Sequence, residues 1–385
     1  MRAVLFTNEI LGLGHLRRSL ALASALVASD EEATALVVTG SHGLGAMPIP
    51  PRVDVMKLPT APVTPESEWR ATELAPPASL AIEPKAISQL RAQLSLAAVR
   101  EVRPDAVLVD VAPLGRDDDL RPALEWLRAE GQATVALGLW EVADGADRRR
   151  WTPELIDAVR ELYDMVIVYG EASAEDARVV RLGEAGIPVL TTGVVGSPAA
   201  EARPTDHGDY LLVTAGGGVD GYPLLDTTLA AIRAEPLPIP VLLVAGPLMA
   251  TSEFVKLQRS AAGLDVQVHR VRTDMQALIA GARGVVSMAG YSTVAELLAS
   301  GKPALLIPRA FPRDEQLLRA RRWAVAGRVD LLEPDSLTPA ALRRAIDRLL
   351  AQRPSPAQPL TGAQDTARVL AEASEQRLVE LPLAH

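Results

Sequence analysis

The stretch GVVSMAGYSTVAELLASGKPALLIPR, residues 284–309, decides the fold. It begins with a short apolar run, passes through a glycine turn, continues with apolar side chains at helical spacing over 292–301, and ends in a second apolar run. A buried strand, a helix and another buried strand in this order form a βαβ unit with parallel strands. The stretch therefore predicts an α/β fold with a parallel sheet covered by helices on both faces.

The same alternation runs through the rest of the C-terminal half. Further strand-like runs occur at 210–216 (YLLVTAG), 240–246 (PVLLVAG) and 266–271 (VQVHRV). Stretches with apolar residues at helical period separate them. Residues 209–360 are therefore expected to form one Rossmann-like, doubly wound domain.

The N-terminal half repeats the pattern less regularly. Its strand candidates are 2–8, 33–40, 105–111, 134–141, 165–171 and 188–195. They predict a second Rossmann-like domain over residues 1–200. The stretch 196–209 has the glycine, proline and polar content of a linker, and 59–84, rich in proline and alanine, is expected to be a long irregular surface segment. A last helical segment within 361–385 is a candidate for packing back on the N-terminal domain.

Composition excludes several classes of function. The chain has 385 residues and a net charge of −9, so nucleic acid is not expected as a partner. It has no cysteine, which removes disulfides and thiolate metal sites and fits a cytoplasmic location. No apolar run approaches the ~20 residues that span a bilayer, so we expect no transmembrane segment, while peripheral membrane contact stays open.

The apolar run after Arg17 and Arg18 resembles a signal peptide, but it follows a strand-like run and a glycine turn, which favours the first helix of a βα unit.

Three glycine-rich turns lie between a predicted strand and a predicted helix, at 12–15 (GLGH), 215–218 (AGGG) and 289–293 (AGYST). In a doubly wound sheet such turns lie at the carboxyl ends of the strands, where helix N-termini present free N–H groups to anions. Any one of them is explained equally well by sterics, because tight turns use glycine. Together they predict a ligand in a cleft between two domains. The candidate contacts in the second and third turns are Gly217, Gly218, Gly290, Ser292 and Thr293.

Two polar residues follow the third turn. Glu296 lies four residues after Ser292, one helical turn along, where a carboxylate can accept hydrogen bonds from a ribose diol. A solvated helix glutamate is the alternative interpretation. Gln316 comes shortly after the next predicted strand and can reach sugar hydroxyls from the same edge.

His15 is the most suggestive single residue, because it directly follows the first glycine turn and its type has the pKa range of a general base. Asp110 ends a predicted strand of the same domain, where it can orient an imidazole. The alternatives are a capping or phosphate-contacting histidine and a plain strand-end carboxylate.

Other charged groups give weaker signals. The run of Asp117, Asp118 and Asp119 has the look of a metal site, but it precedes a helical stretch and suits a helix N-terminus better. Arg319, Arg321 and Arg322 are expected on solvated helix faces. No metal site is expected.

These residues together resemble a known family. The string SMAGYSTVAELLASGKPALLIPR, followed by DEQ, resembles the donor-binding signature of GT-B glycosyltransferases, in particular those similar to the peptidoglycan N-acetylglucosaminyltransferase. The opening GLGHLRRSLALASAL resembles their N-terminal acceptor-side motif, while RPDAVLVDVAPLG and ELYDMVIVYGE are more similar to a branch of predicted glycosyltransferases. The resemblance implies two Rossmann-like domains facing a central cleft, with a nucleotide-diphosphate sugar held mainly by the C-terminal one.

The resemblance also implies roles for individual residues. Glu296 matches the glutamate that binds the donor ribose, and Gln316 matches a sugar-contacting position. The helix start at Ser292 and Thr293 matches the part that faces the diphosphate, with Gly217 and Gly218 in the loop beside the phosphates. The loop 269–275, which contains Arg272, matches the segment that recognises the base.

On the acceptor side the resemblance covers Gly14, in the GLGH motif, and Glu141, in the segment LWEVAD. There is one departure in this segment. Where the predicted branch carries an arginine–aspartate pair, this chain has Trp140 and Glu141.

The sequence thus predicts a glycosyltransferase that moves a sugar from a nucleotide-diphosphate sugar, a UDP-sugar first of all, to an unidentified acceptor. Inversion at the anomeric carbon follows from the resemblance alone. We expect no metal and no cofactor besides the donor. One alternative is a nucleotide-sugar epimerase or hydrolase of the same fold, although the threonine–arginine–proline–glutamate string of such epimerases does not follow the first strand. A non-catalytic nucleotide-sugar-binding protein is another.

Overall fold

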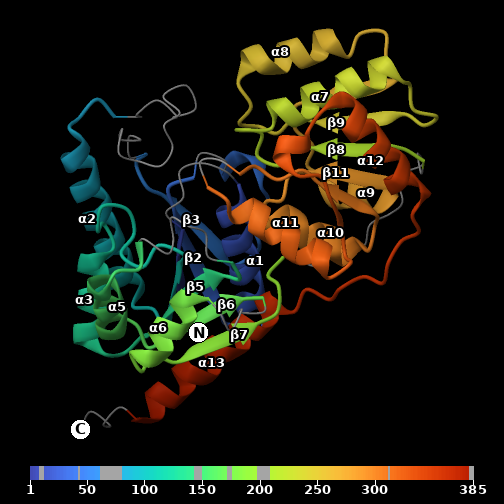
Figure 1. Cartoon of the computed structure of the whole chain (residues 1–385). Coiled ribbons are helices and arrows are strands. Elements are labelled where there is room, and N and C mark those ends of the chain that lie inside the picture. The colour runs from blue at the N-terminus through green and yellow to red at the C-terminus, as the bar shows by residue number, and fades with distance from the viewer. Residues whose placement is uncertain are drawn as a thin grey trace. The chain divides into compact units, whose positions relative to one another are not determined.

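The computed structural model describes residues 1–7, 13–41, 44–60, 80–142, 150–170, 176–196, 209–310 and 313–380. The chain divides into two compact units, each an α/β body (Figure 1). The N-terminal unit contains Met1–Leu11, His15–Gly196 and Leu360–His385, and the C-terminal unit contains Gly12–Gly14 and Ser197–Pro359. Most of the predicted linker, 197–208, and most of the predicted irregular segment, 61–79, lie outside the described residues.

The N-terminal unit is built on a sheet of parallel strands in the order β3-β2-β1-β4-β5-β6-β7. The strands are β1 (Arg2–Thr7), β2 (Thr34–Thr39), β3 (Val53–Lys57), β4 (Ala106–Asp110), β5 (Thr134–Trp140), β6 (Met165–Tyr169) and β7 (Val189–Thr192). Its helices are α1 (Gly14–Ala28), α2 (Pro84–Val102), α3 (Arg121–Glu130), α5 (Pro153–Leu162), α6 (Ala177–Glu184) and α13 (Gly362–Glu380), with a 3-10 turn at Leu44–Ala46.

The C-terminal unit repeats this plan with the strand order β10-β9-β8-β11-β12-β13. The strands are β8 (Leu211–Thr214), β9 (Val241–Val244), β10 (Val266–His269), β11 (Gly284–Ser287), β12 (Ala304–Leu306) and β13 (Asp330–Leu331). Its helices are α7 (Tyr222–Ala234), α8 (Thr251–Ser260), α9 (Met275–Gly281), α10 (Tyr291–Ser300), α11 (Glu315–Val325) and α12 (Pro339–Ala351), with a 3-10 turn at Pro334–Ser336. Two Rossmann-like domains with parallel sheets, the predicted fold class, are confirmed.

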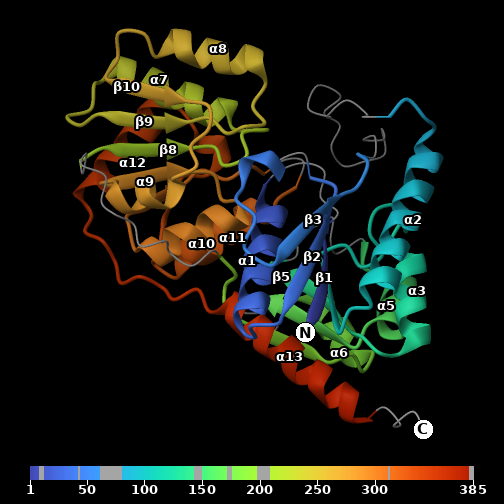
Figure 2. The same cartoon turned by 180° about the vertical axis from the view of Figure 1, so that it is seen from behind.

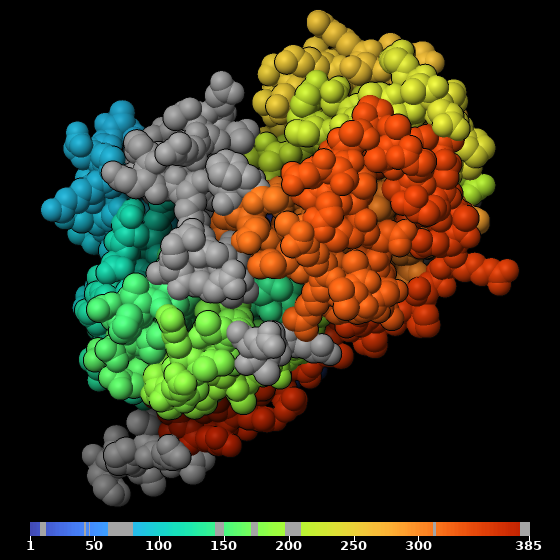
Figure 3. Space-filling model, viewed as in Figure 1, coloured from blue at the N-terminus to red at the C-terminus, as the bar shows by residue number. Residues whose placement is uncertain are grey.

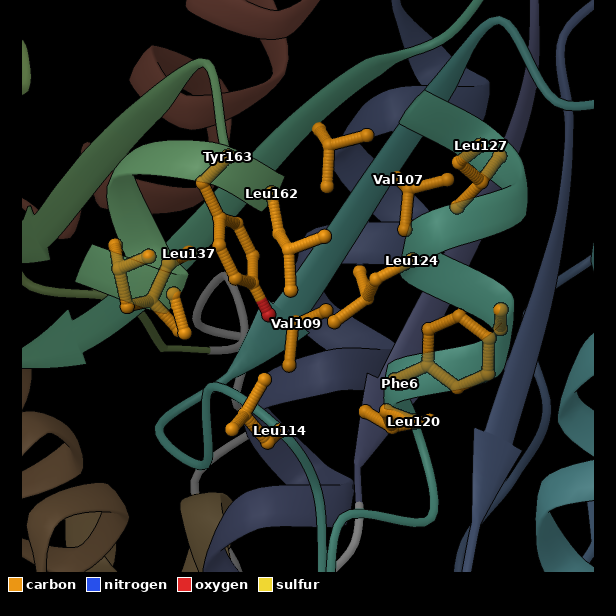
Figure 4. Close-up of a cluster of buried hydrophobic side chains, with 14 of the residues drawn as sticks. Phe6, Val107, Val109, Leu114, Leu120, Leu124, Leu127, Leu137, Leu162 and Tyr163 are labelled. Atoms are coloured by element: carbon orange, nitrogen blue, oxygen red, sulfur yellow. The ribbon is translucent and has the colours of Figure 1, made fainter. Parts of the chain in front are cut away.

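The sheets hold together because their central strands are apolar on both faces. Every residue of β4, β5 and β11 is buried, as expected for parallel strands covered by helices. Figure 4 shows one such layer, in which Val107 and Val109 of β4 pack against Leu124 and Leu127 of α3. Fully burying one of these side chains contributes about 1.5–3 kcal/mol.

The strand order of each sheet places its carboxyl edge where a ligand can bind. In the N-terminal unit β1 pairs with β2 on one side and with β4 on the other, and in the C-terminal unit β8 pairs with β9 and β11. The order of the strands reverses between β1 and β4 and between β8 and β11. At such points the connections leave the sheet in opposite directions, and ligands of α/β sheets generally bind there. The segments that follow β1, β4, β8 and β11 are the ones that carry the predicted site residues.

Two strands lie outside the predicted set. β3 is an edge strand whose sequence, VDVMK, is only partly buried, so it lacks the continuous apolar run of a central strand. β13 has only the two residues Asp330 and Leu331 and pairs with β12. Both are strands because a neighbouring strand offers them hydrogen-bonding partners, which their own sequence does not reveal. No helix in the described part of the chain combines the length and apolar character needed to cross a membrane.

The C-terminal helix α13 belongs to the N-terminal unit. Its first residue, Gly362, donates its N–H to the carbonyl of Val194 at 3.2 Å, and Ser374 Oγ donates to the carbonyl of Asp105 at 3.1 Å. Near its end, Arg377 forms an ion pair with Asp164. Figure 2 shows the helix along the same sheet from behind, and in Figure 3 its red atoms lie against the green atoms of this unit.

The close contact between Gly362 and Gly193, the residue after β7, leads to a prediction about folding stability. A Cβ at Gly362 would overlap the carbonyl oxygen of Gly193, so Gly362→Ala should lower the free energy of unfolding by about 1–3 kcal/mol through overpacking. The matched control is Gly183→Ala in α6, where an added Cβ meets nothing within 4 Å and the better helix former should be neutral or stabilising by up to ~1 kcal/mol. Chemical denaturation of both variants tests this, and equal stabilities would contradict it.

Candidate active site

The N-terminal unit brings the predicted pair His15 and Asp110 into contact. Helix α1 begins at Gly14, so His15 lies in its first turn, and Asp110 is the last residue of β4. His15 Nδ1 and Asp110 Oδ2 are 2.6 Å apart, and the side chains are 14% and 3% exposed. The proximity arises because α1 follows β1, which is the neighbour of β4 in the sheet.

Arg18 completes this cluster. It lies one helical turn after His15 and is 2% exposed. Its Nε donates to Asp110 Oδ1 at 3.0 Å, and its Nη2 donates to Oδ2 at 2.8 Å. This two-point geometry is the one that a planar guanidinium favours with a carboxylate. Burial on its own raises the pKa of Asp110, but the charges and hydrogen bonds of Arg18 and His15 outweigh it and hold that pKa below the ordinary value.

The backbone turns sharply directly after Asp110. Val111 has φ 66°, a left-handed conformation that is a genuine outlier for a β-branched residue. Its N–H donates to the carbonyl of Gly138 at 2.8 Å, which fixes the turn to the next strand. Strained backbone of this kind costs of order 1–3 kcal/mol and clusters at functional sites.

Trp140 and Glu141, at the predicted departure from the family pattern, lie at the end of β5. Trp140 is the last residue of the strand, and its ring centroid is 5.1 Å from that of His15. Glu141 is 4% exposed and lies against Gly170, where an added Cβ would be 3.3 Å from the Glu141 Cβ. Trp140 thus lies beside His15, while Glu141, the next residue, packs against Gly170 at the end of β6.

In the C-terminal unit the glycine turn after β8 is tightly packed. Gly216 and Gly218 have φ values of 62° and 91°, which only glycine adopts without strain. A Cβ at Gly218 would also come within 2.5 Å of the carbonyl oxygen of Ala245. The carbonyl of Gly217 accepts the N–H of Leu248 at 2.9 Å. The turn is therefore held against the end of β9.

The N-terminus of α10 lies beside this turn. A Cβ at Gly216 would be 3.6 Å from Thr293 Oγ1, and the first bond within the helix runs from Val294 N to the carbonyl of Gly290 at 3.0 Å. The N–H groups of Ser292 and Thr293 precede this bond and therefore have no carbonyl partner within the helix, and such N–H groups at helix N-termini can bind anions. Glu296 is half-buried in the next turn. The two predicted donor motifs are adjacent in space.

Gln316 lies at the same edge, and its oxygen is already engaged. It is 7% exposed, and its Oε1 accepts the N–H of Ala289 at 3.2 Å and that of Arg309 at 3.4 Å. Because both partners are donors, the oxygen must face them. A hydrogen bond to a sugar hydroxyl therefore has to come from the amide nitrogen.

Arg309 links the glycine turn to α11. Its guanidinium pairs with Asp220 at 2.8 Å and with Glu315 at 2.5 Å. Burial alone lowers the pKa of Arg309, but the two carboxylates reverse the effect and hold that pKa above its usual value. The network fixes the segment after the glycine turn against the start of the helix that carries Gln316.

The predicted base-side residue Arg272 is paired within its own loop. Its guanidinium donates to Asp274 with Nε···Oδ1 2.8 Å and Nη2···Oδ2 2.5 Å. This hydrogen bonding raises the pKa of Arg272 and lowers the pKa of Asp274. The arginine thereby orders the loop directly before α9.

One expectation about the arginines was wrong. Arg319 is 1% exposed rather than solvated, and its Nη1 donates to the carbonyl of Ala289 at 3.1 Å, while its guanidinium lies 5.5 Å from the ring centroid of Tyr291. Arg319 lies one turn into α11, where it packs against the segment that follows β11. The sequence does not reveal this burial, because Arg321 and Arg322 follow closely and make the whole stretch look exposed. Arg321 does lie at the surface, paired with Glu333.

Asp119 differs from its acidic neighbours. It is buried in an ion pair with Arg91 at 2.6 Å, while Asp117 and Asp118 are exposed. Burial raises the pKa of Asp119 despite the arginine. Within the described residues no group of three or more His, Asp or Glu side chains is placed to hold a metal ion.

Sequence reasoning missed Arg18, Arg309 and Asp220. A signal existed for the first two. Arg18 is a charged residue three positions after His15, before a mainly apolar helical stretch, and Arg309 closes an apolar strand at its carboxyl end. Asp220 carries no local signal, because only the folding of the turn brings it to Arg309.

Known proteins share this architecture. Residues 232–374 match the model of the glycosyltransferase family 28 C-terminal domain. A UDP-N-acetylglucosamine–N-acetylmuramyl-(pentapeptide) pyrophosphoryl-undecaprenol N-acetylglucosamine transferase of Mesorhizobium japonicum is 35% identical over 127 residues, 31% of this chain and 34% of the relative. The protein of that name from Granulibacter bethesdensis is 27% identical over 297 residues, 66% of this chain and 77% of the relative. The chain thus spans about a third of the first relative's length.

Solved structures extend the similarity to the whole chain. The calicheamicin glycosyltransferase CalG4 aligns with a TM-score of 0.58 at 19% identity, covering 99% of each chain. The UDP-GlcNAc 2-epimerase of Methanocaldococcus jannaschii aligns with a TM-score of 0.60 at 13% identity, covering 97% of this chain and 100% of the other. The fold is therefore GT-B. Within that class the C-terminal part of the chain is similar to the glycosyltransferase family 28 C-terminal domain, in agreement with the resemblance seen in the sequence.

The ion pair at Asp110 generates a prediction about pH. Because the pKa of Asp110 is lower in the folded chain than its unfolded value of about 3.9, its stabilisation is complete above that value and is lost as the pH falls through the folded-state pKa. Asp110→Asn should cost about 3–5 kcal/mol at pH 7, since it leaves Arg18 buried without its counter-charge. Urea unfolding of both proteins should show this difference shrinking below pH 4, whereas a difference independent of pH would contradict it.

Proposed function

We propose that this protein is a glycosyltransferase that moves a sugar from a UDP-sugar to a nucleophilic acceptor. The observation that carries the proposal is that the family 28 match, 232–374, contains the N-terminus of α10 with Ser292, Thr293 and Glu296 beside the glycine turn after β8. The names of the curated relatives specify UDP-N-acetylglucosamine as their donor, which supports uridine as the base.

In this proposal the C-terminal unit binds the donor. The N–H groups of Ser292 and Thr293 at the start of α10, together with the hydroxyl of Thr293, bind the diphosphate, whose negative charge the helix dipole favours. Glu296 accepts hydrogen bonds from the ribose diol, and the amide nitrogen of Gln316 donates to a sugar hydroxyl. The loop 269–275 provides backbone groups for the base.

The N-terminal unit activates the acceptor. His15 Nε2 takes the proton of the acceptor as its nucleophilic atom attacks the anomeric carbon, and the bond from that carbon to the diphosphate oxygen breaks with its electron pair leaving on the diphosphate. Direct displacement of this kind inverts the anomeric configuration. Asp110 accepts a hydrogen bond from Nδ1–H of His15, stays ionised, and stabilises the imidazolium that forms.

The leaving group needs stabilisation, and α10 offers it. The backbone N–H groups at its N-terminus are fixed by the helix before the reaction. They can therefore stabilise the negative charge that develops on the diphosphate without a rearrangement of the protein. We therefore propose a reaction without a metal or a further cofactor. The absence of cysteine fits a reducing compartment, and we place the reaction in the cytoplasm.

The proposal is tested first by ligand screening. Diphosphates of uridine, thymidine, guanosine and adenosine are compared by thermal shift, since a ligand that binds the native state raises stability by mass action. Uridine diphosphate is expected to give the largest shift. The matching sugar nucleotide is then incubated with the protein and candidate acceptors, and the products are identified. A new glycoside supports transfer, whereas free sugar or an epimerised donor would assign the protein to hydrolysis or epimerisation instead.

Glu296 is the sharpest test of the donor site. Glu296→Ala should weaken nucleotide-sugar binding by about 1.5–3 kcal/mol, the range for hydrogen bonds to a charged group, with little loss of folding stability. The control is Glu235→Ala, at the exposed C-terminal end of α7. Titration calorimetry measures both affinities, and an unchanged affinity of the Glu296 variant would remove this residue from the site.

His15 tests the chemical step. General-base catalysis is typically worth 10²–10⁴-fold, so His15→Ala should lower kcat by about two decades or more while donor affinity, measured by calorimetry, stays nearly unchanged. Normal turnover would place the base elsewhere, with Glu141 as the next candidate. Loss of donor binding would instead identify His15 as a phosphate contact.

A further inference from the structure

We propose that Arg18 is a positioning residue that, through Asp110, fixes the tautomer of His15, with the proton on Nδ1 and the lone pair on Nε2. The inference rests on the proposed role of His15 as a base, and it adds a function for a buried arginine. Arg18 is too deeply buried, at 2% exposure, to contact a substrate itself.

The first step of the argument is the orientation of Asp110. Both of its carboxylate oxygens are held by one guanidinium, with Nε···Oδ1 3.0 Å and Nη2···Oδ2 2.8 Å. Two parallel hydrogen bonds from a rigid fork define the plane of the carboxylate, which a single contact cannot do. Since an arginine in a protein does not lose its charge, it also keeps Asp110 ionised.

The second step concerns the proton on His15. Its Nδ1 lies 2.6 Å from Asp110 Oδ2 and 2.9 Å from Arg18 Nη2. An ionised carboxylate only accepts hydrogen bonds and a guanidinium only donates them. If Nδ1 carried a lone pair, two acceptors would face each other at the shorter of the two distances. With the proton on Nδ1, that short contact is a hydrogen bond, and Nε2 keeps the lone pair that a base requires.

The third step is what holds Arg18 in place. Its guanidinium carbon lies 5.7 Å from the ring centroid of Trp140 and 5.4 Å from that of Tyr169, within the range of cation–π attraction. Tyr169, in turn, lies across Gly138 of the neighbouring strand, where any Cβ would overlap its phenol group. A glycine in β5 therefore makes room for the ring that holds the arginine.

An arginine that served stability alone would not be expected to affect the proton on His15. The two roles are separated by nuclear magnetic resonance of protein labelled with ¹⁵N-histidine, in the absence of donor and acceptor. The His15 signals are assigned by their loss in His15→Gln. In the wild-type protein, above the pH at which the ring is charged, we expect one tautomer with Nδ1 protonated. The opposite tautomer in the wild-type protein would overturn the proposal without any further variant.

The variants then test Arg18. Arg18→Met should give a mixture of tautomers, and so should Arg18→Lys, which keeps the charge but not the fork. Tyr169→Phe, which keeps the ring, is the control and should retain a single tautomer. If the Met variant does not fold, the Lys variant carries the test. A pure Nδ1-protonated state in a folded Arg18→Lys protein would overturn the requirement for a guanidinium.

Kinetics add a second readout once an acceptor is known. Arg18→Met should lower kcat by roughly tenfold or more with little change in donor KM, and it should have no further effect on kcat in the His15→Ala background, because residues acting as a unit are not additive. Additive losses would show that Arg18 acts independently of His15. Because the tautomer is measured without substrate, it decides the role of Arg18 even if no sugar transfer is found.

Discussion

The parallel pairing of a first strand with neighbours on both sides is the constraint on which the rest of this structure depends. β1 lies between β2 and β4, and β8 lies between β9 and β11. All strands of a parallel sheet end at the same edge, so residues far apart in the sequence meet there. His15 and Asp110, 95 positions apart, become partners for this reason, and so do the glycine turn after β8 and the start of α10.

Buried arginines hold these strand ends together. Four of the largest fully buried side chains are arginines: Arg18, Arg91, Arg178 and Arg319. Arg18 binds the carboxylate that ends β4, and Arg178 donates to the carbonyl of Trp140 at the end of β5 at 2.9 Å. Arg319 does the same for Ala289 after β11. Desolvating a charge is costly, so each is paired with a carboxylate or a carbonyl or lies over an aromatic ring.

Backbone with positive φ occurs at these edges as well as elsewhere in the chain. Val111 adopts a left-handed conformation directly after Asp110, and Gly216, Gly218 and Gly246 have positive φ in the turns after β8 and β9. A left-handed conformation costs a glycine little free energy, whereas at Val111 contacts with the surrounding structure must compensate for its cost. The hydrogen bond from its N–H to Gly138 is part of that support. At Val111 the local conformational preference thus yields to tertiary structure.

The sequence by itself determined the central strands, the alternating helices, the two Rossmann-like domains and the glycine turns, because continuous apolar runs and turn residues act over a few neighbouring positions. It also pointed to His15 and Asp110, each from its place at the end of an element. Only the tertiary structure decided that these two side chains form a hydrogen bond, that Arg18 and Arg319 are buried, and that β3 and β13 are strands. The sequence does not distinguish a charged side chain that faces water from one that is paired with a carboxylate, because the partner comes from a distant element. That partner is chosen by the order of strands in the sheet, which no local pattern records.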